Sequence, residues 1–128
     1  MNYQFSKTIQ LPFDEAITHV TEALKNEGFG ILTEIDVQAT LKKKLNVDFK
    51  PYKILGACNP PFAYEALLAE DKIGAMLPCN VIVQMQTDGQ VEVSAVDPVA
   101  SMMAIENPAL SAIATQIQAK LKKVIDNL

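Results

Sequence analysis

Arginine is absent from this 128-residue sequence, and all eleven basic side chains are lysines. Without a guanidinium group, the chain has no planar fork that could bind a phosphate or a guanine edge in two places. Fifteen acidic residues give a net charge of −4, which repels a polyanion. We therefore expect no nucleic acid partner, and we interpret the run Lys42-Lys43-Lys44 as the solvated face of a helix.

Long apolar runs are also absent. The first twelve residues, MNYQFSKTIQLP, alternate polar and apolar side chains instead of forming the apolar stretch of a signal peptide. No later segment approaches the length that spans a membrane, so we expect a cytoplasmic protein with no membrane segment. Hydrophobic residues make up 49% and charged residues 20% of the chain, which is enough for a core within one domain, residues 1–128.

The common enzyme motifs are missing as well. The sequence contains no GxGxxG, P-loop, GxSxG or HExxH pattern, and no CxxC or HxxxH spacing that would indicate zinc. The only histidine, His19, falls off the apolar stripe of its predicted helix, so we expect it at the surface. The sequence therefore gives no positive indication of an enzyme.

Hydrophobic periodicity predicts the order of the secondary structure elements. Period-two alternation and flanking turn residues predict strands over residues 2–9, 29–35, 52–58, 79–86 and 91–96. Helical spacing and capping residues predict a long helix from residue 13 to Gly28, a short helix after Asp36, a helix after Asn59 and a long last helix from Asn107. This order favours an α+β fold, in which two long helices cover one face of a largely antiparallel five-stranded sheet.

A three-residue loop, Thr87-Asp88-Gly89, is predicted between the last two strands. It pairs Val83 with Val93 on one face, whereas a two-residue loop would turn the apolar sets to opposite faces. Such a loop places its glycine in the left-handed region. The same register, continued along the strands, sets Cys79 across from Asp97.

Only two cysteines occur, and asparagine follows each of them, in Cys58-Asn59 and Cys79-Asn80. Cys58 ends the third predicted strand and Cys79 begins the fourth. If these strands are antiparallel neighbours, both thiols and Asp97 gather at one end of the sheet. Our candidate ligand-binding residues are therefore Cys58, Asn59, Cys79, Asn80 and Asp97.

Two kinds of thiol chemistry fit this set. A helix N-terminus stabilises a neighbouring thiolate, as expected for Cys58, while a carboxylate disfavours one, as expected for Cys79 beside Asp97. Unequal thiols of this kind suit redox chemistry or sulfur transfer. Alternatively, Cys58 and Cys79 together with Met102 could hold a soft metal ion such as Cu(I), since Met76 and Met103 are also expected near this end.

Structural roles are the alternative for the same residues. Free cysteine often acts as a small hydrophobic residue in a core. Asn59 and Asp97 each precede a proline, as helix N-caps often do. Asn80 stands at the start of a strand, where asparagine is disfavoured, so its amide is a candidate hydrogen-bond partner for a ligand.

Three sequence blocks, YKILGACNPPFAYEAL (52–67), IGAMLPCNVIVQ (73–84) and VSAVDP (93–98), resemble the domain of unknown function family 302. The resemblance covers nearly the whole chain and implies a fold of the TATA-binding-protein class, in the order β-α-β(4)-α, and a homodimer. It does not imply DNA binding, because a fold does not carry a function with it. Many members keep pairs like Asn59-Pro60 and Leu77-Pro78 but lack the two cysteines, so the resemblance is to a cysteine-bearing subset.

Three hypotheses for function follow. The first is a homodimeric binding module that holds a small ligand or a soft metal ion at Cys58 and Cys79. The second is a thiol redox or sulfur-transfer protein, in which Cys58 attacks and Cys79 resolves. The third is a dimerisation domain with no ligand.

Overall fold

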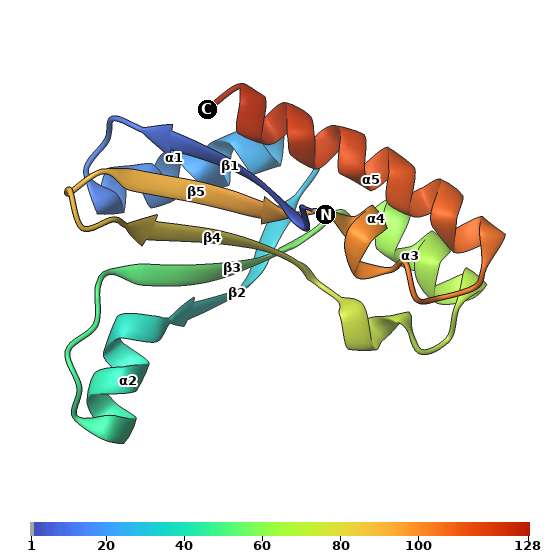
Figure 1. The fold of residues 1–128 in the computed structure, drawn as a ribbon. Coiled ribbons are helices and arrows are strands. Elements are labelled where there is room, and N and C mark those ends of the chain that lie inside the picture. The colour runs from blue at the N-terminus through green and yellow to red at the C-terminus, as the bar shows by residue number, and fades with distance from the viewer. Residues whose placement is uncertain (1) are drawn as a thin grey trace.

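The computed structural model describes residues 2–128 (Figure 1). The strands are β1 (Gln4–Ile9), β2 (Gly30–Asp36), β3 (Tyr52–Cys58), β4 (Cys79–Met85) and β5 (Val91–Val96). The helices are α1 (Phe13–Asn26), α2 (Val37–Leu45), α3 (Pro60–Ala69), α4 (Pro98–Ser101) and α5 (Pro108–Asp126), with a 3-10 helix, η1 (Ile73–Met76).

The five strands form one antiparallel sheet in the order β1-β5-β4-β3-β2. The predicted α+β class and the antiparallel sheet are confirmed. The first two strands lie at opposite edges, so α1 carries the chain across the whole sheet between them. As expected for an edge strand, β1 holds a charged residue on its apolar side. The Lys7 ammonium donates to the backbone carbonyls of Asp126 and Leu128, at 3.1 Å and 2.9 Å, where the carbonyl end of α5 favours a cation.

The hairpin between β4 and β5 has the predicted register. Val83 pairs with Val93 and Val81 with Ala95, so the apolar residues of both strands share one face. Gly89 has a φ of +83°, the left-handed conformation that the three-residue loop requires.

The core lies between that face of the sheet and the two long helices, α1 and α5, which Figure 1 shows together on one side of the strands. The apolar stripe of α5 is buried there, as predicted from its helical spacing. The helix contributes Leu110, Ile113, Ala114, Ile117, Leu121, Val124 and Ile125 to the core.

The short helix after Asp36 also forms as predicted. The Asp36 carboxylate caps it by accepting a hydrogen bond of 2.9 Å from the amide of Ala39. No residue of α2 is buried, and the run Lys42-Lys43-Lys44 is exposed in its last turn. In Figure 1 this helix projects away from the sheet, on the side opposite α1 and α5.

The short element η1 was not predicted, and α4 was indicated only by the N-cap interpretation of Asp97. Each is a single turn between longer elements, too short to show a hydrophobic period. Within residues 2–128, no helix is both long enough and apolar enough to cross a membrane.

Candidate functional site

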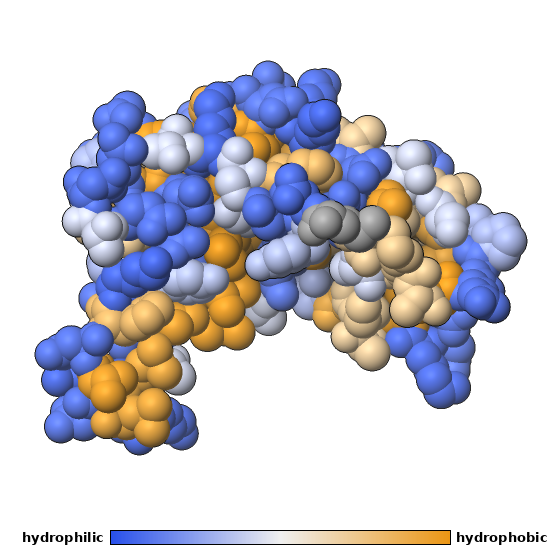
Figure 2. Space-filling model, viewed as in Figure 1, coloured by the Kyte–Doolittle hydropathy of each residue, from blue (hydrophilic) through white to orange (hydrophobic). Residues whose placement is uncertain are grey.

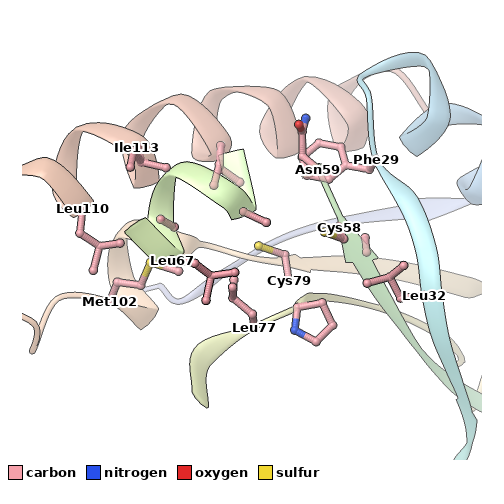
Figure 3. Close-up of a pocket in the computed structure, with 15 residues that line it drawn as sticks. Phe29, Leu32, Cys58, Asn59, Leu67, Leu77, Cys79, Met102, Leu110 and Ile113 are labelled. Atoms are coloured by element: carbon pink, nitrogen blue, oxygen red, sulfur yellow. The ribbon is translucent and has the colours of Figure 1, made fainter. Parts of the chain in front are cut away.

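The two cysteines meet at one end of the sheet because β3 and β4 are antiparallel neighbours. Ala57 pairs with Cys79 across the ladder, and Cys58 is the next residue along β3. This arrangement confirms the predicted adjacency of the two strands. Both cysteines are free thiols and line the same cavity (Figure 3).

The cavity has a volume of about 250 Å³ and opens to the surface. The end of β3 and the entry to β4 supply Ala57, Cys58, Asn59, Leu77, Pro78 and Cys79. Helices α3 and α5 supply Ala63, Ala66, Leu67, Leu110, Ile113 and Ile117, and the remaining walls are Phe29, Leu32 and Met102. Apart from Asn59 and the two thiols, every side chain in these walls is hydrocarbon or thioether.

Cys79 is the buried member of the pair. Its side chain faces the core, the residue is 6% exposed, and Figure 3 shows its sulfur directed into the cavity. Burial, reinforced by the negative charge that Cys58 would carry as a thiolate, raises the pKa of Cys79 to about 11. Cys79 is therefore a protonated thiol at neutral pH.

Cys58 is partly exposed and stands at the boundary between β3 and α3. Asn59, the residue after it, occupies the N-cap position of α3, and Pro60 and Pro61 fill the first helical turn. The predicted position of a thiol immediately before a helix N-terminus is thus confirmed. Cys58 is the more accessible of the two sulfurs.

Asn59 occupies the predicted N-cap position, but its side chain makes no capping hydrogen bond. The amide group instead donates to the backbone carbonyl of Glu27, at 3.3 Å, just after α1 ends. In Figure 3 the amide points away from the Cys79 sulfur. Asn59 thereby ties the start of α3 to the α1–β2 turn, where Gly28 has a φ of +87°.

Asn80 lies away from this cavity. It is exposed and lines a separate, more polar hollow on the other face of the sheet, together with Ser6, Ile82 and Ser94. Successive residues of a strand point to opposite faces, so Cys79 and Asn80 cannot both face the core. The structure therefore separates Asn80 from the other members of the predicted site.

Asp97 does not lie against Cys79 as the continued register predicted. The β4–β5 ladder ends at the pair Val81–Ala95, and the Asp97 amide bonds the Tyr3 carbonyl instead. The Asp97 carboxylate caps α4 through the amides of Val99 and Ala100. It also accepts from the Gln118 amide at 3.0 Å and 3.2 Å. The N-cap interpretation of Asp97 is confirmed, and Asp97 is not among the residues that line the cavity with Cys79.

Of the three methionines considered as metal ligands, only Met102 lines the cavity, and it is buried. Met76 and Met103 are exposed outside it. Cys58, Cys79 and Met102 are thus the side chains that could offer sulfur to a soft ion. Across residues 2–128, no group of three or more His, Cys, Asp and Glu side chains is arranged to hold a metal ion. His19 is exposed, as predicted.

Sequence reasoning missed most of the cavity wall. Helical spacing predicted the last helix but not that its residues Leu110, Ile113 and Ile117 would line a cavity, and Ala63 and Ala66 were not singled out. Hydrophobic spacing identifies a buried face but does not distinguish a filled core from the wall of a cavity.

Comparison with known proteins agrees with this architecture. The sequence profile described as "Domain of unknown function DUF302" matches residues 5–128. A crystal structure of an uncharacterized conserved DUF302 protein from Bacillus stearothermophilus superimposes with a TM-score of 0.89 at 30% sequence identity, covering 97% of this chain and 96% of that one. No curated protein matches the chain. The profile match spans nearly all of the sequence, so the chain belongs to the DUF302 family.

Proposed function

We propose that this protein is a homodimeric binding module whose ligand is a small organic molecule held in the Cys58/Cys79 cavity. The observation that carries the proposal is the cavity itself, where residues from β3, β4, α3 and α5 surround one open, largely apolar space. Pockets of this kind, concave and mostly apolar with few polar groups, are where proteins bind small molecules.

A soft metal ion is the alternative ligand at the same residues, but the chemistry of Cys79 favours an organic one. Thiolate is the form of cysteine that binds metals. The raised pKa of Cys79 keeps its sulfur protonated at neutral pH, so a metal would first have to displace a tightly held proton.

Native mass spectrometry of the protein purified from the cells that make it tests the binding function. We expect a non-covalent adduct on the wild-type chain that is lost in Ala66→Leu, because Ala66 is buried in the cavity wall and a larger side chain would fill the space. Ala112→Leu, an exposed position on the same helix as Ile113, is the matched control and should keep the adduct. Repeated spectra of a clean, unliganded wild-type chain would argue against the function.

The proposed dimer uses an arm formed by α2 and the loop that follows it, residues 37–50. Its apolar side chains Leu45, Val47 and Phe49 are between 40% and 66% exposed. Figure 2 shows an apolar surface on the projecting arm, rimmed by hydrophilic residues. Exposed apolar patches with a polar rim are typical of interaction sites.

The total surface of the chain supports a second copy as the partner. The chain exposes 7492 Å². A compact monomer of its mass, 14.0 kDa, is expected to expose about 6700 Å². The chain is therefore more extended than a compact monomer of its mass, and the projecting arm offers surface that a second copy could cover.

Sedimentation velocity over a range of concentrations tests the dimer. We expect the wild-type chain to be dimeric and Phe49→Asp to be monomeric, because a carboxylate in the arm would be buried without a partner. Leu68→Asp is the control, since Leu68 is 71% exposed on α3, outside the arm. A monomeric wild type, or a dimer broken only by Leu68→Asp, would contradict the arm as the interface.

A second candidate function is thiol redox or sulfur-transfer chemistry. It is favoured by one observation, that Cys58 is partly exposed beside a buried Cys79 in the same cavity. In this reaction the Cys58 thiolate would attack one sulfur of a substrate disulfide, and the other substrate sulfur would leave as a thiolate. Cys79 would then attack the Cys58 sulfur of the mixed disulfide, which releases the remaining substrate thiolate and leaves a Cys58–Cys79 disulfide. The free thiols of either function fit a reducing compartment, so we also propose a cytoplasmic location.

A dimerisation domain without a ligand is the third candidate, and native mass spectra that show a dimer without an adduct would favour it.

A further inference from the structure

Among residues 2–128, no charged side chain lines the cavity. Among its fifteen lining residues the side-chain polar groups are the Asn59 amide and the two thiols (Figure 3). The Asn59 amide already donates to the Glu27 carbonyl and points away from the Cys79 sulfur. A charged group placed among these walls would lose its hydration without gaining a partner, so the cavity selects against ions.

Small side chains create the space. Ala57 and Cys79 face each other across β3 and β4, and Ala63 and Ala66 of α3 line the same cavity. A cavity of about 150 Å³ with apolar walls binds benzene. By proportion, the 250 Å³ here suits a compact molecule of roughly ten non-hydrogen atoms.

Aromatic character is favoured by the groups that a ligand would contact. Phe29 offers a ring, and aromatic pairs gain from offset or edge-to-face contact beyond the burial of area. Met102 and Cys79 offer polarisable sulfur atoms, which contact aromatic rings favourably. A saturated chain of the same size would make neither contact.

Leu32 and Leu67 lie at the mouth of the cavity. Leu32 is 66% exposed and Leu67 is 44% exposed, although both line the cavity. Their exposure places apolar surface at the mouth, where a hydrophobic molecule leaving water would first make contact. No charged side chain lines the cavity with them that could attract an ion to this entrance.

We propose that the ligand of this cavity is an uncharged aromatic molecule of about two fused rings. This inference rests on the proposed binding function and narrows it to one class of ligand. Cys58 lines the partly exposed side of this cavity.

Naphthalene is the probe for the class, and 2-naphthoate is the matched probe that adds a single carboxylate. Binding is measured by naphthalene fluorescence, which tryptophan emission does not obscure because the chain contains no tryptophan. The rise in the melting temperature of the protein at saturating naphthalene is the second measurement. We expect saturable binding of naphthalene with one site per chain. We expect 2-naphthoate to bind at least tenfold more weakly at pH 7.5, because its charge would enter an apolar space.

Cavity-filling variants locate the site. Ala66→Leu and Ala63→Leu should each lose naphthalene binding at least tenfold, while Ala112→Leu, outside the cavity, should bind as the wild type does. The two filling variants change different positions on α3, so if one variant fails to fold the other still tests the site. Binding that persists in a folded filling variant, or equal affinity for naphthalene and 2-naphthoate, would overturn the inference.

The failure of the inference can be told apart from the failure of the proposed function. If naphthalene does not bind but the wild-type chain carries an adduct that Ala66→Leu loses, the module binds a ligand of another class and only the inference falls. If naphthalene does not bind and the native spectra are clean, both fall. Binding of naphthalene with the expected charge discrimination supports both.

Discussion

Ala57 of β3 lies directly opposite Cys79 of β4, and both side chains face the helices. Facing positions in an antiparallel ladder are close neighbours on one side of the sheet, so two small residues there leave space that larger residues would fill. Helices α3 and α5 close over that space, and the result is a cavity with sulfur in its wall. The pairing thus accounts for both the location and the volume of the candidate site.

The folded state should protect Cys79 from alkylation. Burial raises the pKa of Cys79 from 9.0 to about 11, and thiolate is the reactive form, so its thiolate population at neutral pH falls about hundredfold. We expect iodoacetamide at pH 7.5 to label Cys79 at least a hundredfold more slowly in the native protein than in urea. Peptide mass mapping over time measures the rate. Equal rates in the two states would show that Cys79 is accessible and ionised in the fold, as the redox hypothesis prefers.

The same shift predicts how stability depends on pH. Between pH 9 and 11 the unfolded chain releases the Cys79 proton while the folded chain retains it, so the free energy of unfolding is unaffected below pH 9 and falls as the pH rises. The total fall is about 3 kcal/mol for a shift of this size. Urea denaturation across this range should show a steeper decline for the wild type than for Cys79→Ala. Lysines and tyrosines titrate in both proteins, so parallel curves would refute the assignment to Cys79.

The two asparagines that follow the cysteines should differ in their effect on stability. Asn59→Ala removes the hydrogen bond to the Glu27 carbonyl in a buried setting and should cost about 1–2 kcal/mol. Asn80→Ala changes an exposed side chain on the other face of the sheet and should stay within about 0.5 kcal/mol. Chemical denaturation of both variants tests the contrast. A larger loss in Asn80→Ala would mean that the outer face of the sheet is covered by a partner.

Gly56 is required where β3 passes between its neighbours. A Cβ at this position would overlap the Thr33 hydroxyl and lie 2.8 Å from Cγ of Pro78. We expect Gly56→Ala to destabilise the fold by about 2–3 kcal/mol through overpacking. Gly30→Ala is the control, because a Cβ there meets nothing within 4 Å. Melting temperatures of the two variants measure the difference, and equal values would show that the strands yield easily at Gly56.

Cys79-Asn80 and Cys58-Asn59 show how far sequence reasoning reached into the site. Alternation along β4 was enough to put Cys79 in the core, and the same alternation puts Asn80 on the opposite face. The partner of Asn59 was beyond prediction, because the Glu27 carbonyl is 32 residues away and no local pattern encodes that contact. The position of Asp97 was predicted by extending a ladder that ends at the pair Val81–Ala95. Asp97 caps α4 instead, a single turn that is too short to leave a periodic signal.

By itself, the sequence determined the five strands, the long helices and the hairpin register, and it placed Cys58 at the end of one strand and Cys79 at the start of the next. These features depend on local periodicity and turn chemistry, which residues close in the chain specify together. Only the tertiary structure decided that small side chains from β3, β4 and α3 would face a common cavity. It also decided that α5 would cover this cavity without filling it. A cavity is set by the summed volumes of residues distant in sequence, and a hydrophobic pattern records which residues are buried but not how much room they leave.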